Sequence, residues 1–455
     1  MDKIIEIVTS ISSFLWGPPM LILLVGGGLW MTIALDFVQF RHFKFIMAET
    51  MGKLIKPDKT GDGTITAFQA TTSALANTVG ASNIIGVPVA IAMGGPGAIF
   101  WMWLSGVLGL GIKWAEVALS VEYREKDKVD GTFVGGPSHY LSKGLNAKWL
   151  GTLFAFVLML ELIPSVGSQA VAVSENAAAL GIPKIASGIL IAIFAGLVVF
   201  GGIKRIGKVT EKLIPGMVLI YLAVAWIIIA LNIANLPGAI VLIFKSAFTP
   251  VAATGGFAGA GIAAAARWGV ARGVYSNEAG MGQAGIAHAA AITDHPGRQG
   301  MWAMFEVIVD TFFVCSTTAF LTLTTGLWTT MGPKAAATIP SVAIGAVIGE
   351  TFAMYFMTFC LIFFVLSTVI GNCFYGEQMA RYLFGNKFAK FMLVVYIVVV
   401  VIASTSDLAT IYNFLDILLA AVVIPNVIGV VMMTKKCREI KKDFFDNESY
   451  VPAKK

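Results

Sequence analysis

The stretch Ala76-Asn77-Thr78-Val79-Gly80-Ala81-Ser82-Asn83-Ile84-Ile85-Gly86-Val87-Pro88 decides the fold of this chain. It lies in the middle of an apolar segment that is long enough to cross a bilayer. Glycine, asparagine and proline interrupt a helix there and expose peptide groups, each of which needs a partner inside a membrane. Membrane proteins keep such a break mainly where the exposed backbone binds a polar solute. The stretch therefore predicts a solute transporter.

The composition places the whole chain in a lipid bilayer. Of its 455 residues, 57% are hydrophobic and 13% are charged, whereas soluble domains carry about 25% charged residues. The mean hydropathy is +0.82. The net charge of +6 comes from basic connections between spans and does not indicate a nucleic-acid partner. The four cysteines form no CxxC pair or metal spacing, so we expect free thiols.

Hydropathy predicts eleven membrane-spanning segments, of which the seventh is too long and too glycine-rich for one straight helix. They are 17–38, 67–93, 96–121, 151–180, 185–202, 210–232, 256–291, 299–329, 346–376, 390–404 and 408–433. Most of the 32 basic residues fall in alternate connections, on one side of the membrane. The positive-inside rule then predicts a multi-pass protein of the cell membrane with its N-terminus outside and its C-terminus in the cytoplasm.

The ten spans after the first form two sets of five with opposite orientation, and each set opens with a glycine-interrupted helix. Ser82-Asn83-Ile84-Ile85-Gly86 matches Ser276-Asn277-Glu278-Ala279-Gly280 as S-N-x-x-G. Glycine-rich membrane helices also serve close packing, but paired interruptions at corresponding positions indicate a transporter's binding site. The predicted fold is an all-α polytopic protein with a five-plus-five inverted repeat, broken in spans 2 and 7, and one extra N-terminal helix.

These segments predict a simple division of the chain. It comprises the extra helix (1–40), a basic cytoplasmic connection (41–66), the first five-helix repeat (67–235), an external loop (236–255), the second repeat (256–433) and a basic cytoplasmic tail (434–455).

One block carries a specific resemblance. Gly94-Gly95-Pro96-Gly97-Ala98-Ile99-Phe100-Trp101-Met102-Trp103-Leu104 resembles the signature of the alanine or glycine:cation symporter family, and residues 77–86, 135–137 and 273–282 support it. That family is similar to the sodium-coupled transporters with a leucine-transporter-like fold. The resemblance implies uptake of alanine or glycine driven by sodium (Na+) or, in some members, by protons, with no organic cofactor.

An amino-acid substrate presents a carboxylate and an ammonium group. The carboxylate suits the exposed amides at a half-helix N-terminus, where the helix dipole is positive. The candidates for this role are the amides of Gly80, Ala81 and Ser82, with hydrogen bonds from the side chains of Asn77 and Thr78. Freed carbonyls in the second break would accept from the ammonium group, and the candidates are Gly273, Val274, Ser276 and Asn277, together with the Asn77 oxygen. Gln169 contacts either the substrate or another helix.

The resemblance also implies a sodium site, since two hydroxyl residues of span 9 face the first break in the resembled fold. By that similarity the ion ligands are Ser367, Thr368 and the carbonyls of Phe364, Ala76 and Val79. Sodium prefers such oxygen ligands, by the hard-ion logic that applies to calcium. The alternative is that both hydroxyls only bond back to their own helix.

Charged residues inside the spans add coupling candidates. Lys113 and Glu116 are three residues apart on one helix face and are expected to neutralise each other. Glu306 and Asp310 repel unless a cation or proton separates them. Asp310 is therefore a coupling candidate, with an arginine of span 7 (Arg267 or Arg272) as its alternative partner. Glu278, inside the second break, is the other coupling candidate.

The sequence thus predicts sodium-coupled symport of alanine or glycine by alternating access. A proton-coupled symporter of the same fold is the main alternative. A channel is disfavoured by the repeat within one chain and by the two midplane breaks. The sequence has no P-loop and no clustered catalytic residues, so neither ATP-driven transport nor an intramembrane enzyme is expected.

Overall fold

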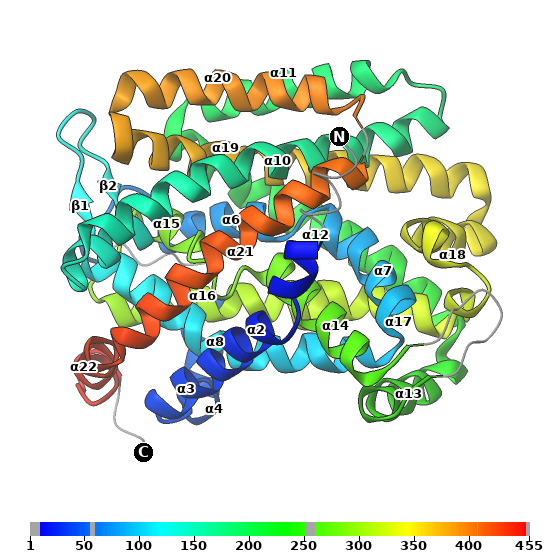
Figure 1. Cartoon of the computed structure of the whole chain (residues 1–455), viewed down its shortest axis with the longest axis horizontal. Helices are drawn as coiled ribbons and strands as arrows, with labels where there is room; N and C mark the ends of the chain where they lie inside the picture. The colour runs from blue at the N-terminus through cyan, green and yellow to red at the C-terminus, as the bar shows by residue number, and fades with distance from the viewer. Residues whose placement is uncertain (1–9, 55–59, 252–259, 407, 452–455) are drawn as a thin grey trace.

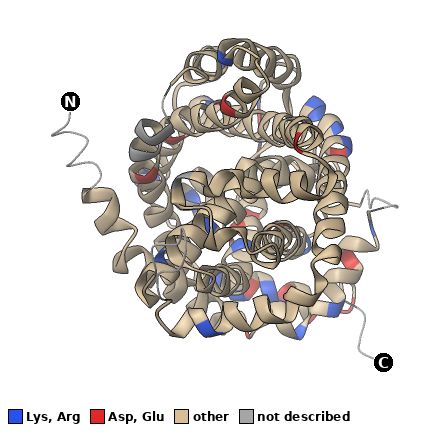
Figure 2. Ribbon diagram, turned by 90° about the vertical axis from the view of Figure 1, so that its right-hand side faces the viewer, with Lys and Arg blue, Asp and Glu red and all other residues tan. Residues whose placement is uncertain are grey.

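Apolar helices make up nearly all of the described chain, as the hydropathy predicts. The computed structural model describes residues 10–54, 60–251, 260–406 and 408–451. Its helices run mostly along the long axis of the molecule (Figure 1). Most of the ribbon carries no charged residue, as Figure 2 shows, which suits a surface that faces lipid.

The N-terminal part and the first half of the chain are almost wholly helical. The N-terminal elements are α2 (Pro18–Leu21), η1 (Ile22–Gly26), α3 (Gly27–Ala34), α4 (Val38–Arg41) and α5 (Phe43–Met51). The first half continues with α6 (Ala67–Thr78), η2 (Ser82–Gly86), α7 (Val87–Gly94), α8 (Gly97–Glu122), β1 (Glu125–Lys126), β2 (Phe133–Val134), α9 (Pro137–His139), η3 (Tyr140–Gly144), α10 (Lys148–Ala179), α11 (Lys184–Val199) and α12 (Gly202–Leu231).

The second half repeats this character. It comprises η4 (Ile233–Asn235), α13 (Leu236–Phe248), α14 (Ile262–Asn277), α15 (Ala284–His288), α16 (Pro296–Val307), η5 (Ile308–Cys315), α17 (Ser316–Thr324), η6 (Leu327–Thr329), η7 (Pro333–Thr338), α18 (Ile339–Ile348), α19 (Glu350–Phe384), α20 (Asn386–Ala403), α21 (Leu408–Met432) and α22 (Thr434–Phe445).

The all-α membrane architecture is confirmed, with both interruptions in the predicted spans. Within the described residues, eight helices are long and apolar enough to cross a membrane, and α6 with η2–α7 makes a ninth if that bent pair is one span. Eleven spans remain a prediction, because α11 has only 16 residues and the α14–α15 segment is interrupted. The predicted loop 236–255 contains helix α13, which sequence analysis missed.

The interior is built around two long helices, α8 and α10. Helix α8 packs against α14, α16 and α3, and α10 packs against α19, α21 and α20. Glycine permits the closest of these approaches: a Cβ atom on Gly269 of α14 would lie 2.2 Å from the Ala98 carbonyl oxygen of α8. Small residues play this role widely in membrane helices. The close contact fixes the second interrupted helix against α8.

The predicted basic tail begins as an ordered amphipathic helix, α22. It lies at the same end of the molecule as the β1–β2 hairpin, and α13 and α18 lie at the other end (Figure 1). Lys436 contacts Glu122 at 2.5 Å, and Lys441 contacts Asp36 at 2.6 Å. The apolar face of α22 buries Cys437, Ile440, Phe444 and Phe445. We call this end, where the predicted cytoplasmic basic residues gather, the basic face.

Candidate functional site

The first interruption bends a membrane helix in mid-course. Helix α6 ends at Thr78, and the axis of the segment Ser82–Gly94 is turned by 50° from that of α6. Val79 leaves the helical conformation with ψ of 88°. The amide of Gly80 is freed by this turn and donates to Asn83 Oδ1 at 2.9 Å. An asparagine side chain thus satisfies a backbone group that lipid would leave unpaired.

The second interruption has a different backbone conformation, but an asparagine side chain again accepts from a freed amide. Helix α14 ends at Asn277, and Glu278 then adopts φ of 57°, a left-handed conformation that costs a non-glycine residue about 1–2 kcal/mol. Gly280 and Gly282 follow at φ of 100° and 74°. Asn277 Oδ1 accepts from the amide of Ala279 at 3.0 Å. Both asparagines of the S-N-x-x-G pattern therefore accept a hydrogen bond from an amide within their own break.

The second break lies later in the chain than the predicted ligand carbonyls require. The Val274 carbonyl accepts from the amide of Glu278 at 2.8 Å, so it is bonded within the last turn of α14. Gly273 also belongs to α14, and a Cβ atom there would meet Ser105 Oγ of α8 at 2.6 Å. The prediction that Gly273 and Val274 offer freed carbonyls is wrong, because the helix continues through Asn277.

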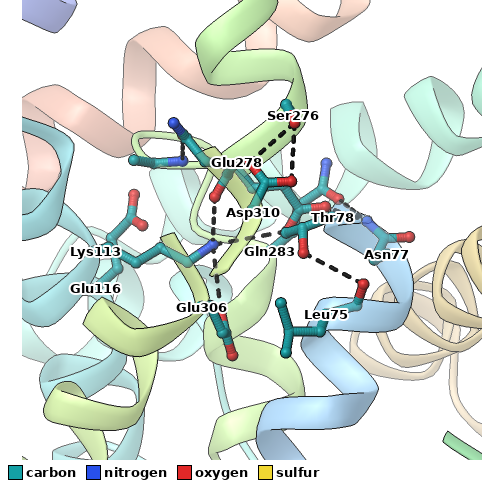
Figure 3. Close-up of polar contacts among 12 residues, drawn as sticks. Leu75, Asn77, Thr78, Lys113, Glu116, Ser276, Glu278, Gln283, Glu306 and Asp310 are labelled. Atoms are coloured by element: carbon teal, nitrogen blue, oxygen red, sulfur yellow. Dashed lines mark hydrogen bonds and ion pairs between the residues drawn. The ribbon is translucent and has the colours of Figure 1, made fainter. Parts of the chain in front are cut away.

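The side chains of these two asparagines both contact a third element, the π-helix η5. Asn83 Nδ2 donates to Asp310 Oδ1 at 2.6 Å, and Asn277 Nδ2 donates to Thr311 Oγ1 at 3.1 Å. Ser276 Oγ lies 2.9 Å from both oxygens of Asp310 (Figure 3). π-Helical turns are rare and often occur at functional sites. Asp310 and Thr311 thus connect both breaks.

Asp310 has no arginine partner among the described residues. Its carboxylate accepts from Asn83, Ser276 and Thr311, and the alternative pairing with Arg267 or Arg272 is not observed. Those two arginines instead line a separate pocket. The residues around it are Trp16, Arg267, Trp268, Ala271, Arg272, Tyr275, Asp416 and Leu419. We call it the second pocket.

A buried lysine connects α8 to the second break. Lys113 Nζ donates to the Asn277 carbonyl at 2.9 Å and lies 3.9 Å from Glu278 Oε2 and 3.7 Å from Glu306 Oε2 (Figure 3). The expected pair with Glu116 is not among its contacts. Glu116 accepts instead from Gly280 N and from a side chain of α21, Asn426. Lys113 and Glu116 therefore bond to groups outside α8 and form no ion pair with each other.

Glu306 and Asp310 do not share one cation, although they lie four residues apart. Glu306 contacts Lys113 and accepts from His288 Nε2. The other ring nitrogen of His288, Nδ1, lies 2.6 Å from Gln299 Nε2. Asp310 faces the two asparagines instead. The π-helical turn begins at Ile308, between the two carboxylates. The change in helical phase gives each acidic residue its own set of partners.

A small cavity lies between the two breaks and helices α10 and α19. Its walls are Asn77, Gly80, Ser82, Glu161, Ser165, Gln169, Tyr275, Glu278, Met281, Gln283, Thr368 and Asn372. The free space is about 20 Å³, which is room for a water molecule or two. The structure therefore brings together six predicted residues from four separate segments: Asn77, Gly80, Ser82, Gln169, Glu278 and Thr368. We call it the central cavity.

The central cavity is lined by hydrogen-bond acceptors that lack donors. Among the described residues, Asn77 Oδ1, Glu161 Oε2, Gln169 Oε1 and Glu278 Oε2 are buried without a hydrogen-bond partner. Asn77 donates through its other side-chain atom, Nδ2, to Glu278 and to Gln283 Oε1. Buried polar atoms are almost always paired. Four acceptors without a hydrogen-bond donor, of which only Glu278 Oε2 has an ion-pair partner, Lys113, therefore suit a ligand that brings several N–H donors or a positive charge.

The hydroxyl residues predicted to bind sodium face in two directions. Ser367 and Thr368 both donate to the Phe364 carbonyl, at 2.8 and 3.0 Å. Ser367 also contacts Met217 on α12 at 3.8 Å, away from the cavity. Thr368 faces the first break, since a Cβ atom on Gly80 would lie 2.5 Å from its Oγ1. Thr368 is thus the hydroxyl that reaches the cavity.

The remaining predicted residues lie at the breaks, and of those described in this paragraph only Ser82 lines the cavity. Thr78 Oγ1 bonds back to the Leu75 carbonyl at 3.3 Å. Ala76 and Val79 are buried at the C-terminal end of α6, and Ala81 and Ser82 begin the next helical segment, η2. Amides in such a first turn have no partner within the helix, which fits the role proposed for them.

Sequence reasoning missed Glu161, which the structure places in the wall of the central cavity. It lies in the middle of α10 and is 1% exposed. The sequence did contain a signal, because an acidic residue inside a long apolar span costs free energy and is usually functional. Ser165, Tyr275, Gln283 and Asn372 were also missed, and only the folded arrangement brings them to the cavity.

Comparisons with known proteins agree with this geometry. The model of the sodium:alanine symporter family matches residues 1–454. The uncharacterised transporter YflA of Bacillus subtilis is 45% identical, with 99% of this chain and 95% of that protein aligned. The sodium/alanine symporter AgcS of Methanococcus maripaludis is 38% identical, over 96% and 98%. The crystal structure of MhsT in complex with L-phenylalanine matches with a TM-score of 0.61 at 12% identity, over 85% and 94% of the two chains, and so shares the fold.

Lys113→Met is expected to destabilise the folded protein strongly. It leaves Glu278 and Glu306 buried without their positive partner, and removing one member of a buried ion pair costs about 3–5 kcal/mol. Thermal unfolding of the purified protein in detergent is the measurement, and the variant should unfold at a clearly lower temperature than the wild type.

Lys208→Met is the matched control, because Lys208 is exposed on α12. It should unfold like the wild type. Adding Glu306→Gln to Lys113→Met should recover part of the loss, since one uncompensated carboxylate is then removed. Equal unfolding temperatures for Lys113→Met and Lys208→Met would show that the lysine does not balance these acids.

Proposed function

The chain belongs to the sodium:alanine symporter family, and on this premise we propose that it carries alanine or glycine into the cell together with sodium. It is an amino-acid:cation symporter embedded in a membrane, and not an enzyme. The substrate, the ion and the direction of transport are the proposed part. The positive-inside rule supports a cytoplasmic basic face, with α22 inside the cell.

The observation that carries the proposal is a surplus of buried acidic residues. Five carboxylates surround the two breaks, and Lys113 is the one buried lysine or arginine among the described residues. The five are Glu116, Glu161, Glu278, Glu306 and Asp310. Ionised carboxylates are very costly to bury without compensation. Protons or other cations must therefore balance these carboxylates, and a substrate ammonium group and a metal ion are two that a symporter brings.

The central cavity supports a small zwitterionic substrate. We expect the amides of Ala81 and Ser82, at the start of a half-helix beside the cavity, to bind its carboxylate. Asn77 Oδ1 and Gln169 Oε1 are unpaired acceptors for its ammonium group. The free space holds only a water molecule or two, so loading an amino acid requires the walls to move. That requirement agrees with alternating access around a site at the breaks.

Two groups of oxygens support a sodium site. One is Asp310 with Ser276 and Thr311, a carboxylate beside two hydroxyls. The other is Thr368 with the carbonyls of Phe364, Ala76 and Val79, to which the resemblance also adds Ser367. Both groups contain only the hard oxygen ligands that sodium prefers, by analogy with calcium. Glu278 is held by Lys113 and Asn77, so it suits gating or proton binding better than sodium.

Uptake of labelled alanine and glycine into proteoliposomes tests the proposal. An imposed inward sodium gradient should drive concentrative uptake of both amino acids, whereas a proton gradient alone should not. Uptake driven by protons alone would instead support the proton-coupled alternative. Passive flux without any dependence on an ion gradient would contradict symport and favour a channel.

Thr368→Ala should raise the sodium concentration needed for half-maximal uptake. Loss of one oxygen bonded to a charged group is worth about 1.5–3 kcal/mol, which corresponds to a rise of roughly tenfold or more. Ser367→Ala is the matched comparison on the same helix and should have the smaller effect, because Ser367 faces Met217. An unchanged sodium dependence in both variants would show that Thr368 and Ser367 do not bind sodium. The group around Asp310 would then be the remaining candidate site.

A further inference from the structure

Glu161 occupies a position that substrate and ion binding do not by themselves explain. It lies halfway along α10, is 1% exposed and lines the central cavity. Its Oε2 atom has no hydrogen-bond partner. Helix α10 already supplies Gln169 to the cavity. A second, acidic side chain from the same helix therefore indicates a further role.

The groups around Glu161 offer it no positive charge. Glu278, another carboxylate, lines the same cavity. Tyr396 of α20 is the other titratable neighbour, and its hydroxyl donates to the Met159 carbonyl at 2.7 Å. From α19, Thr368 and Asn372 line the cavity and are uncharged. Titratable side chains on the packed elements α19 and α21 include Cys373, Tyr375, Glu377, Arg381 and Asp416. Arg381 pairs with Glu377 and Asp130, and Asp416 lines the second pocket.

The one buried lysine is already engaged elsewhere. Lys113 lies within 4 Å of both Glu278 and Glu306, and no ion pair within the described residues includes Glu161. A carboxylate that is closed off from water beside a second carboxylate favours its neutral, protonated form. Once protonated, it also becomes a donor. The acceptors Asn77 Oδ1 and Gln169 Oε1, which lack a donor, line the same cavity.

We propose that Glu161 holds a proton when no substrate is bound and releases it when the substrate ammonium group enters the central cavity. The inference rests on the proposed function and adds to it. The exchange is balanced: a protonated carboxyl group and an ammonium ion give a carboxylate–ammonium pair and one free proton. Only one of the two cations fits beside Glu161 at a time. The carrier that returns without substrate then takes a proton back across the membrane, opposite to the amino acid.

The expected observation is proton release on substrate binding. Alanine is added to the purified protein in weakly buffered detergent solution that contains sodium chloride, and a pH indicator is read while calorimetry measures binding in parallel. The wild type should release about one proton for each alanine bound, and its apparent affinity should rise about tenfold per pH unit while the free carrier is protonated. Glu161→Gln should bind alanine without release and with no pH dependence of affinity.

Glu175→Gln is the matched control, since Glu175 is an exposed glutamate on the same helix. It should release protons like the wild type. If Glu161→Gln does not fold, Glu161→Asp keeps the carboxyl group and should still release a proton, at a shifted pH. Binding without proton release in the wild type, or unchanged release in Glu161→Gln, would overturn the inference.

A second readout does not depend on alanine being the substrate. Infrared spectroscopy at neutral pH should show the carbonyl stretch of a protonated carboxyl group in the wild type and in Glu175→Gln, and should show it weakened in Glu161→Gln. Failure to bind alanine with this signal present would contradict the proposed substrate and leave the proton site standing. A spectrum that Glu161→Gln leaves unchanged would contradict the proton site itself.

Discussion

Every peptide group that a broken membrane helix frees must find a partner inside the protein, and this constraint organises the site. Asn83 and Asn277, which occupy the same position of a repeated S-N-x-x-G pattern, each accept from a freed amide. Their other side-chain atoms donate to two consecutive residues of η5, Asp310 and Thr311. A single π-helical turn thereby joins the two breaks. Movement of either half-helix must disturb the same pair of hydrogen bonds, which provides a physical route for coupling.

The second constraint is electrostatic. The interior concentrates carboxylates around the breaks with one lysine among them, an arrangement that is unfavourable unless cations are bound. A protein selected only for stability would replace these acids with apolar residues. Their presence makes sense if protons, sodium and the substrate ammonium group occupy the region in turn. The unpaired acceptors of the central cavity and the carboxylate of Asp310 then mark two adjacent places for positive charge.

The sequence predicted those features that local chemistry controls. Hydropathy predicted the apolar helical architecture, and Gly80, Asn83 and Pro88 located the first break, because such residues interrupt helices whatever surrounds them. The repeated pattern also located the second break around Glu278. The carbonyls of Gly273 and Val274 were wrongly expected to be free, since α14 continues through Asn277. Lys113 and Glu116 seemed a natural pair by spacing, but partners on other helices replaced that pairing.

Other features needed the folded chain. The tail was predicted only as a basic extension. The helical spacing of Cys437, Ile440 and Phe444 indicates the buried face of α22. Glu161 was visible as a charge inside an apolar span, but its meaning depends on Gln169, Glu278 and Thr368, which reach the cavity from distant segments. Sequence spacing carries no information about such contacts between side chains on different helices.

Binding of radiolabelled sodium to the purified protein tests the central claim most directly, since the claim is that buried acids at the breaks are balanced by bound cations. The account predicts saturable sodium binding that alanine strengthens and that Asp310→Asn weakens severely, while Asp446→Asn, at the exposed end of α22, leaves it unchanged. Sodium binding that is absent from the wild type, or that is equal in the wild type and Asp310→Asn, would contradict the account.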